Sequence, residues 1–599
     1  MNLQEYLKEN RLITDGAMGT FFDSRKQSEL TAEMGNKKAP KLVKEIHKEY
    51  IKAGARLLRT NTFDMAGEPF DTREKTQECI RLACSIARKA VEECREEGIL
   101  DDSEPVFIGA DIGPVNYDYQ CAKDDILNRY LWITDCFLKE NVDCFVFETQ
   151  AEFGILGEIT SYIKARDDIF ILVQFSFDKT GYTKAGLSIP SMVRAMERQQ
   201  TIDGYGFNCG MSSSHLSRIL NKTAFEGNKY ISALPNASYT SMSRGKIVYS
   251  NNVPYFADMM EKLDSIGIRI LGGCCGTTPN YIRSLSERLK NRPLRQIQTI
   301  PADRGKSNIL QRENPLLAKL NRGEKIIMVE LDPPFGENAD KVLEGAAFLK
   351  GKGTDVITLS DSPLGRARMD SALLAVKVLK ETGMPVMPHI SCRDKNIIAL
   401  RGLLLGLSMN GLDNILIVTG DPVQKGDGVK QVFEYNSIRL MNYVKTMNED
   451  VFAGHPFFYG GALNYSGVNK EAVAARMKSK IEAGVSCFLT QPVYSDEDIE
   501  RITYLRNETG AKIIAGVMPL VSHKNAVFIQ NEMPGIHISD EIMNRYAQDL
   551  SREEYEDIAV EVSEDIIKKL DGVAAGYYFM TPFNRYALIQ RIINRITVQ

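Results

Sequence analysis

The feature that most constrains the fold of this 599-residue chain is a regular alternation of short apolar, β-branched runs with longer helical patterns. Such an alternation is typical of parallel strands joined by crossover helices. The first half has eight such runs: RLITDGAMGT, RLLRTNTF, VFIGADIGP, CFVFETQ, FILVQFSF, GYGFNCG, YISALPNAS and IRILGGCCG. The second half has eight more: KIIMVELDPP, DVITLSDSP, PVMPHISC, NILIVTGD, PFFYGGALN, CFLTQPVY, KIIAGVMPL and GYYFMTPFN. Eight βα units in about 250 residues is the size of one TIM barrel, so we predict an α/β chain of two consecutive TIM (β/α)8 barrels.

The alternation stops between the two halves. Residues 291–314, NRPLRQIQTIPADRGKSNILQREN, are polar and contain two prolines, which favours a linker. We therefore predict one barrel over residues 1–290 and another over residues 315–599. In such barrels the carboxyl ends of the strands face the active site, and most of the apolar runs end in polar residues, glycine or proline.

The composition of the chain argues against nucleic acid and membranes as binding partners. The chain is 43% hydrophobic and 25% charged with a formal net charge of -4, which is globular and gives no reason to expect nucleic acid or a membrane surface. The first residues, MNLQEYLKENRLITDG, carry charges where a signal peptide needs an apolar stretch. No apolar run is long enough to span a bilayer, so we expect a cytoplasmic protein.

Three of the eleven cysteines differ in context from the rest. Disulfides are rare in cytosolic proteins, and free cysteine is most often a small buried hydrophobe. That interpretation suits the cysteines in mixed apolar surroundings, which are Cys79, Cys84, Cys94, Cys121, Cys136, Cys144, Cys392 and Cys487. Cys209, Cys274 and Cys275 remain, each at the end of an apolar run.

The vicinal pair Cys274 and Cys275 lies in the segment ILGGCCGTTP. Glycines on both sides allow the chain to turn where the strand ends, so the two sulfurs can converge with Cys209 from two elements earlier. Three thiolates with an open fourth position describe a catalytic zinc site, and such a site would activate a substrate thiol for alkyl transfer. A redox-sensitive pair or plain buried cysteines are the alternatives.

The amino-terminal half resembles the homocysteine S-methyltransferase family. The resemblance rests on the motifs DGAMGT, TNTF, DIGP, FET, NC and GGCCGTTP, in that order over about residues 1–290. It implies Zn²⁺ bound by Cys209, Cys274 and Cys275, with the sulfur of homocysteine as the fourth ligand. It also implies that Asp15 and Glu148 hold the amino group of homocysteine. A carboxylate at a strand end is a sensible partner for an ammonium group, although Asp15 could instead cap the following turn.

The carboxyl-terminal half lacks both common nucleotide-binding fingerprints. No G-x-G-x-x-G follows a predicted strand and no G-x-x-x-x-G-K-[ST] occurs, so any nucleotide cofactor would have to be held by the barrel itself. Polar side chains at its strand ends include Glu330, Thr358, His389, Asp421, Gln491, Asn584 and Arg585. A carboxylate after a strongly apolar run can have a raised pKa and act as a general acid. His389 is equally compatible with a core position.

These strand ends resemble the methylenetetrahydrofolate reductase family over about residues 315–599. The motifs that carry the resemblance are VELDPP, PHISC, TGDP, KIEAG, TQPVY, GVMP and FNR. It implies FAD, reduced by NAD(P)H and oxidised by 5,10-methylenetetrahydrofolate. By position, Glu330 would be the acid that assists ring opening, Asp421 would lie beside flavin and pterin, and Gln491 would bind the pterin. Thr358, His389 and Lys480 would contact FAD.

Three positions depart from this second family. Ser479 stands where a basic residue is usual before the lysine, Thr419 stands where an arginine is typical, and GGALNYSG lacks the usual Tyr-Pro-Glu stretch. The changes at Thr419 and in GGALNYSG affect the details expected for flavin and nicotinamide binding. They leave FAD as the expected cofactor.

Together the two resemblances imply a bifunctional enzyme of consecutive one-carbon steps. One barrel would form 5-methyltetrahydrofolate and the other would methylate homocysteine to methionine. No D-x-H-x-x-G cobalamin motif occurs, so the methyl donor is left open among a separate methylcorrinoid protein, S-methylmethionine and S-adenosylmethionine. The sequence also leaves room for a homo-oligomer. The alternative is that one barrel is catalytic and the other is a sensor module for homocysteine or folate.

Overall fold

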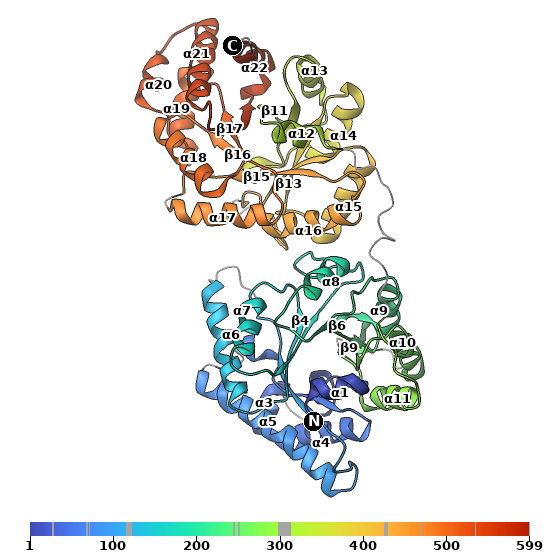
Figure 1. The fold of residues 1–599 in the computed structure, drawn as a ribbon. Coiled ribbons are helices and arrows are strands. Elements are labelled where there is room, and N and C mark those ends of the chain that lie inside the picture. The colour runs from blue at the N-terminus through green and yellow to red at the C-terminus, as the bar shows by residue number, and fades with distance from the viewer. Residues whose placement is uncertain are drawn as a thin grey trace. The chain divides into compact units, whose positions relative to one another are not determined.

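The structure, a computed structural model, divides into two compact units, Met1–Ser307 and Asn308–Gln599 (Figure 1). It describes residues 1–597 apart from 27–28, 68–69, 71, 116–122, 244–245, 250–251, 298–312, 424–428, 468 and 534. Most of the predicted linker, 291–314, therefore lies outside the described residues. Each unit is described by itself below.

The amino-terminal unit is an eight-stranded parallel sheet in the order β1-β10-β7-β6-β5-β4-β3-β2. Its strands are β1 (Leu12–Ile13), β2 (Leu57–Arg59), β3 (Phe107–Ile112), β4 (Cys144–Gln150), β5 (Phe170–Phe175), β6 (Gly204–Ser212), β7 (Tyr230–Asn236) and β10 (Ile270–Leu271). The edge strands β1 and β2 meet at a parallel bridge between Thr14 and Leu57. This bridge brings the two edges of the sheet together into a barrel.

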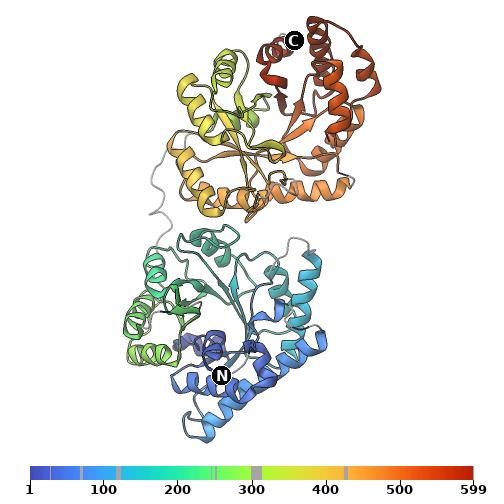
Figure 2. The same cartoon turned by 180° about the vertical axis from the view of Figure 1, so that it is seen from behind.

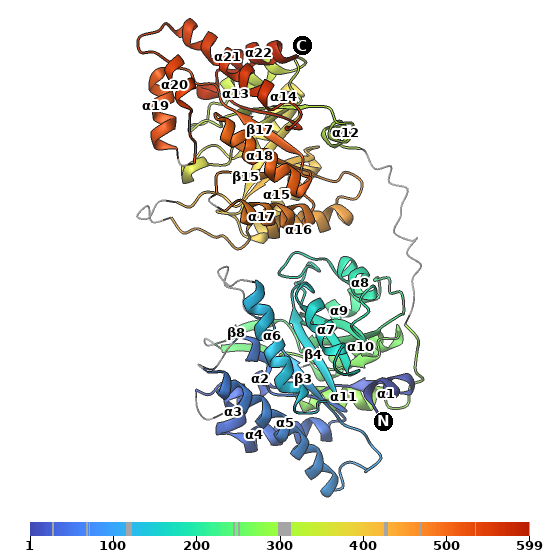
Figure 3. The same cartoon turned by 60° about the vertical axis from the view of Figure 1, so that its left-hand side comes forward.

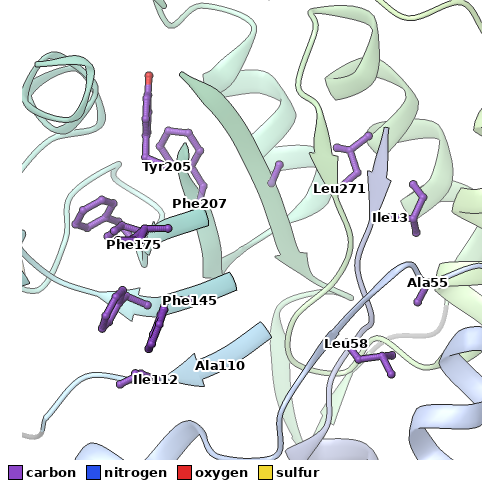
Figure 4. Close-up of a cluster of buried hydrophobic side chains, with 14 of the residues drawn as sticks. Ile13, Ala55, Leu58, Ala110, Ile112, Phe145, Phe175, Tyr205, Phe207 and Leu271 are labelled. Atoms are coloured by element: carbon purple, nitrogen blue, oxygen red, sulfur yellow. The ribbon is translucent and has the colours of Figure 1, made fainter. Parts of the chain in front are cut away.

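Helices surround this barrel, most of them on its outside, and α1 (Leu3–Glu9) packs against the amino ends of the strands (Figure 2 and Figure 3). The others are α2 (Gly19–Arg25), α3 (Ala32–Lys38), α4 (Pro40–Lys52), η1 (Phe63–Gly67), α5 (Arg73–Glu96), α6 (Lys123–Leu138), α7 (Leu156–Lys164), α8 (Ile189–Glu197), α9 (Ser213–Leu220), α10 (Val253–Ser265) and α11 (Pro279–Leu289). Apolar side chains between strands and helices form the main core, including Phe145, Phe175 and Phe207 (Figure 4).

The carboxyl-terminal unit is a closed parallel barrel in sequence order. Its strands are β11 (Ile326–Leu331), β12 (Val356–Leu359), β13 (Val386–Ser391), β14 (Asn414–Val418), β15 (Phe458–Leu463), β16 (Cys487–Pro492), β17 (Ile513–Val517) and β18 (Gly576–Met580). Its helices are α12 (Pro315–Asn321), α13 (Asp340–Leu349), η3 (Pro363–Gly365), α14 (Ser371–Thr382), α15 (Ile397–Met409), α16 (Ser437–Glu449), α17 (Lys470–Glu482), α18 (Asp496–Thr509), α19 (His523–Glu532), α20 (Asp540–Arg545), α21 (Arg552–Lys569), η4 (Pro582–Asn584) and α22 (Tyr586–Thr597).

A short helix packs against the barrel interior in both units. Leu3 and Leu7 of α1 are buried in a cluster with residues near the amino ends of strands, including Leu12, Leu57 and Phe107. Leu316 and Leu320 of α12 are buried in the same way among the inward side chains of the second barrel. Each barrel thus buries apolar side chains toward its amino end, and its polar strand ends lie at the opposite, carboxyl end.

The prediction of two consecutive TIM barrels is confirmed, because each of the sixteen apolar runs coincides with all or most of one barrel strand. The sequence did not predict the antiparallel hairpin of β8 (Thr240–Ser243) and β9 (Lys246–Tyr249), which follows β7. TSMS is too polar for an apolar run, so hydrophobic periodicity does not detect this hairpin. Within the described residues, every helix is too short or too polar to cross a membrane.

Candidate active sites

Three cysteine sulfurs converge at the carboxyl end of the first barrel. Cys209 lies near the end of β6, and Cys274 and Cys275 follow β10. The Sγ atoms of Cys209 and Cys275 are 3.7 Å apart, those of Cys274 and Cys275 are 4.0 Å apart, and all three lie within 4.8 Å of one another. Tetrahedral coordination with Zn–S bonds of about 2.3 Å places sulfurs roughly 3.8 Å apart. The cluster therefore has the dimensions of a zinc thiolate site.

The backbone around the cysteines explains this convergence. Cys209 has φ +54° and Gly276 has φ +79°, so the chain turns at both places where a strand ends. A side chain at Gly272 would come within 1.9 Å of the Thr14 hydroxyl, and one at Gly273 would come within 2.3 Å of the Thr277 hydroxyl. Gly276 therefore supplies the turn, whereas the two glycines before the cysteines allow close packing of the β1 and β10 ends.

The surroundings of the three thiols fit a metal ion. Hydrogen bonds from Cys274 and Cys275 lower the pKa of Cys209, and a further hydrogen bond from Asn236 acts in the same direction. The other side-chain atom of this amide, Asn236 Oδ1, is buried and has no hydrogen-bond partner among the described residues. Hydrogen bonds with Cys209 raise the pKa of Cys274 well above its ordinary value and that of Cys275 to about 12, so in the absence of a cation the negative charge is concentrated on Cys209. Thiolates are ligands that zinc prefers, and binding of the metal would displace the remaining protons.

Two of the predicted substrate-binding carboxylates lie next to this cluster and share one arginine. Arg59, at the end of β2, places Nε 2.7 Å from Asp15 Oδ1 and an Nη atom 2.6 Å from Glu148 Oε2. All three side chains are buried. Although burial opposes the charged form, Asp15 and then Glu148 raise the pKa of Arg59 well above its ordinary value. The sequence analysis missed Arg59, and a cation at the end of the run RLLR was the only available signal.

Asn208 links the carboxylates to the sulfur cluster. Its amide nitrogen donates to Glu148 Oε2 at 3.2 Å and to Thr149 Oγ1 at 2.8 Å, and it lies 3.9 Å from the sulfur of Cys274. Its amide oxygen accepts from the backbone nitrogen of Thr149 at 2.8 Å. One side chain therefore fixes the end of β4 relative to the thiols on β6 and β10.

Asp111 is a third carboxyl group of this site that the sequence analysis did not single out. It belongs to the DIGP motif at the end of β3, and its Oδ1 atom is buried with no hydrogen-bond partner in the described part of the chain. Burial, followed by the negative charge of Glu148, raises the pKa of Asp111 well above its ordinary value. Asp111 therefore takes up a proton more readily than an exposed aspartate, and a cation bound beside it would favour its charged form.

A cavity of about 310 Å³ unites these groups. Its lining includes all three cysteines and all three carboxyl groups, together with Arg59 and the DGAMGT turn. The volume is at the lower end of the range for small-molecule sites, which suits an amino acid. A metal-binding end and an acidic end thus lie in one cavity.

The second barrel carries a larger cavity of about 930 Å³ at its carboxyl end. His389, Asp421 and Lys480 are among its lining residues, whereas Glu330, Thr358 and Gln491 are not. Thr358 is completely buried inside the barrel, and the cavity is lined instead by Ser360, two residues further along. The lining also contains Arg476, which the sequence analysis did not single out. A cavity of this size with two cations fits a dinucleotide such as FAD.

Glu330 lies beside this cavity, and its surroundings favour the protonated form of its carboxyl group. The hydroxyl of Tyr578 donates to Glu330 Oε2, and His389 Nε2 lies 3.8 Å from the same oxygen. Burial, followed by the charge of Asp332, raises the pKa of Glu330 to about 7. Burial also lowers the pKa of His389 to about 4, so this imidazole is neutral and its Nε2 has no hydrogen-bond partner within the described residues. The sequence analysis missed Tyr578.

The remaining predicted residues are spread around the second site. Lys480 is buried on α17 and donates to the carbonyl of Ala462 at 2.7 Å, and burial lowers its pKa to about 8. Asp421 is exposed after β14 and accepts from the backbone nitrogen of Leu364 at 2.8 Å. Gln491 on β16 has a buried Oε1 without a hydrogen-bond partner in the described chain, so it retains an acceptor for a ligand.

Comparison with known proteins matches both halves of the chain to enzyme families. The family described as homocysteine S-methyltransferase matches residues 12–289. The family described as methylenetetrahydrofolate reductase matches residues 316–597. Each match covers most of one barrel, so the family assignment is made for each barrel separately.

Curated relatives include the methionine synthases of Mycobacterium tuberculosis and Mycobacterium leprae. Each is 25% identical to this chain, over 325 and 309 residues, which is 50% and 48% of the chain. The matched parts are 26% and 25% of those proteins, so the chain spans about a quarter of their length.

Similar solved structures include the homocysteine methyltransferase MmuM from Escherichia coli. Its apo form covers 48% of this chain and 98% of its own, at 21% identity and a TM-score of 0.37. Its metallated form covers 48% and 99%, at 20% identity and a TM-score of 0.38. The family matches identify the amino-terminal barrel as a homocysteine S-methyltransferase domain and the carboxyl-terminal barrel as a methylenetetrahydrofolate reductase domain.

Proposed function

We propose that the chain is a bifunctional enzyme of methionine biosynthesis that methylates homocysteine in its first barrel and reduces 5,10-methylenetetrahydrofolate in its second. The observation that carries the first activity is the convergence of three thiols and three carboxyl groups on one cavity. An amino acid that bears both a thiol and an ammonium group complements that cavity. The second activity is supported by Glu330, an acid beside a cavity large enough for a flavin nucleotide.

In the first barrel, Cys209, Cys274 and Cys275 would hold Zn²⁺. A zinc ion supplies the means to keep a substrate thiol deprotonated at neutral pH while it stays nucleophilic. Asp15, Glu148 and Asp111 line the other end of the cavity, and the acidic character of this end suits the ammonium group of homocysteine. Asn208 keeps the two ends at a constant separation, because it contacts both Glu148 and Cys274.

In the second barrel, Lys480, His389 and Asp421 would hold FAD together with Arg476 and Ser360. FAD supplies hydride transfer between a nicotinamide nucleotide, NADH or NADPH, and the folate. Glu330 would protonate the folate amine that leaves when the five-membered ring opens, and Tyr578 holds the carboxyl group in place. The free amide oxygen of Gln491 would bind the pterin. Thr358 lies inside the barrel, so a direct contact with FAD is not part of this proposal.

The pH dependence of folate reduction follows from Glu330. With a pKa of about 7, Glu330 is protonated and able to donate below that pH, and it loses its proton as the pH rises. We expect the rate of flavin reoxidation by 5,10-methylenetetrahydrofolate to be constant below pH 7 and to fall about tenfold per pH unit above it. Stopped-flow absorbance of the flavin across pH 6–9 measures this rate. A rate that stays constant to pH 9 would contradict the assignment.

Lys480 provides a test of the flavin site. Lys480→Met removes a buried cation from the cavity, so we expect FAD to bind roughly 10- to 100-fold more weakly. Titration of the flavin-free protein with FAD, followed by fluorescence, measures the affinity. Lys478→Met is the matched control, because Lys478 is exposed on the same helix and is not a cavity residue. Equal losses in both variants would argue against this location for FAD.

The methyl donor is identified by experiment. The zinc-loaded chain is incubated with homocysteine and, in turn, S-methylmethionine, S-adenosylmethionine, 5-methyltetrahydrofolate and a methylcorrinoid protein, and methionine is measured. Methionine from at least one donor supports the proposal. Protein that binds neither zinc nor FAD after anaerobic purification would contradict it and would favour a redox or sensor role.

A further inference from the structure

Arg59 binds both oxygens of Asp15. Its Nε donates to Asp15 Oδ1 at 2.7 Å, and its backbone nitrogen donates to Asp15 Oδ2 at 2.9 Å. Asp15 is 1% exposed, so both of its oxygens are buried together with these hydrogen bonds. The carboxylate of Asp15 is therefore already bound by Arg59.

The rest of the guanidinium group is held by the protein as well. One terminal nitrogen donates to Glu148 Oε2 at 2.6 Å, and the other donates to the carbonyl oxygens of Gly16 at 2.8 Å and Gly273 at 2.9 Å. These contacts join the ends of β1, β2, β4 and β10. A planar group with donors engaged in several directions has a well-defined position, so Arg59 is suited to orient its partners.

Acidic side chains outnumber cationic ones in the lining of this cavity. Five carboxyl groups line the cavity, on Asp15, Asp23, Glu33, Asp111 and Glu148, and Arg59 is the one cationic side chain among its described lining residues. Buried carboxyl groups without a cation take up protons and lose their attraction for an ammonium group. Burial raises the pKa of Asp15 in this way, and the charge and hydrogen bonds of Arg59 oppose that rise. The unpartnered Asp111 Oδ1 then remains as an acceptor open to a ligand, next to Glu148, with which Asp111 forms a hydrogen bond.

We propose that Arg59 is a specificity-determining residue that selects thiol substrates with an amino group: it holds Asp15, fixes Glu148 through an ion pair, and so directs the substrate ammonium to Glu148 and Asp111. This inference rests on the proposed homocysteine site and deepens it. It assigns Asp15 a positioning role that acts through Arg59, in place of the direct contact that the sequence predicted. Arg59 contacts no reacting atom in this scheme and is itself a positioning residue.

The test compares two thiols that differ only in the amino group. Calorimetry with the full zinc-loaded chain measures the dissociation constants of homocysteine and of 4-mercaptobutyrate, which lacks the amine. Arg59→Met should reduce the preference for homocysteine by about tenfold or more, because a charged hydrogen-bonded contact is lost. Binding of 4-mercaptobutyrate and the zinc content should change little. Arg59→Lys, which retains the charge, should restore most of the preference.

Arg11→Met is the matched control. Arg11 is another largely buried arginine of this barrel, paired with Asp264 at 3.1 Å through Nη2, but it precedes β1 at the opposite end. Its loss should lower stability and leave the preference between the two thiols unchanged. An unchanged preference in Arg59→Met overturns the inference, and Arg59→Gln replaces that variant if it does not fold. A wild-type chain that binds zinc but neither thiol instead refutes the proposed function.

Discussion

Replacing Cys275 with alanine is expected to remove zinc from the full chain and to abolish methyl transfer to homocysteine. Cys275 is one of three sulfurs within 4.8 Å of one another, and two thiolates with one open side bind zinc far more weakly than three. We expect the zinc content to fall from about one ion per chain to nearly none, and the zinc affinity to fall at least about 100-fold. Elemental analysis and competition with a chromophoric chelator measure these quantities.

Cys94→Ala is the control for this prediction. Cys94 is completely buried on α5 and belongs to the hydrophobic core. Its replacement should leave the zinc content unchanged and cost only some stability, because a small cavity forms. If Cys275→Ala retains a full zinc ion while Cys94→Ala does too, the three-sulfur site is wrong. The second barrel provides an internal reference, since its flavin content should not respond to either change.

Glu330→Gln is expected to slow flavin reoxidation by the folate without slowing flavin reduction by the nicotinamide nucleotide. The amide keeps the size of the side chain but cannot donate a proton as an acid, so flavin reoxidation by 5,10-methylenetetrahydrofolate should slow by about 10²- to 10⁴-fold. Flavin reduction by the nicotinamide nucleotide needs no acid at this position and should keep its rate. Stopped-flow absorbance of each half-reaction measures the two rates separately.

Glu324→Gln is the corresponding control. Glu324 is exposed just before β11 and pairs with Arg322 at the surface. Its replacement should leave both half-reactions unchanged. Slowing of both half-reactions in Glu330→Gln would indicate a disturbed flavin site, and unchanged folate turnover would favour a binding or sensing role for this barrel.

The strands of both barrels could be predicted from the sequence. Strands of a parallel barrel are buried on both faces, so they appear in the sequence as continuous apolar runs. The β8–β9 hairpin was not predicted, because it does not belong to the repeated βα units of the barrel and its residues show no alternation of apolar and polar side chains. Thr358 shows a further limit. Thr358 and Ser360 are two residues apart and share a face, so their depth along the strand separates them: Thr358 is buried within the barrel, whereas Ser360, just past the end of β12, lines the cavity.

The sequence by itself determined the two barrels and the residue types that end their strands, including the three cysteines and Glu330. Local pattern is enough for this, because propensity and polarity act over a few neighbouring residues. Only the tertiary structure decided that Arg59 lies between Asp15 and Glu148, that Asp111 joins them, and that Glu330 has a pKa of about 7. The physical reason is that these properties depend on burial and on charges brought together from distant strands, neither of which a linear sequence specifies.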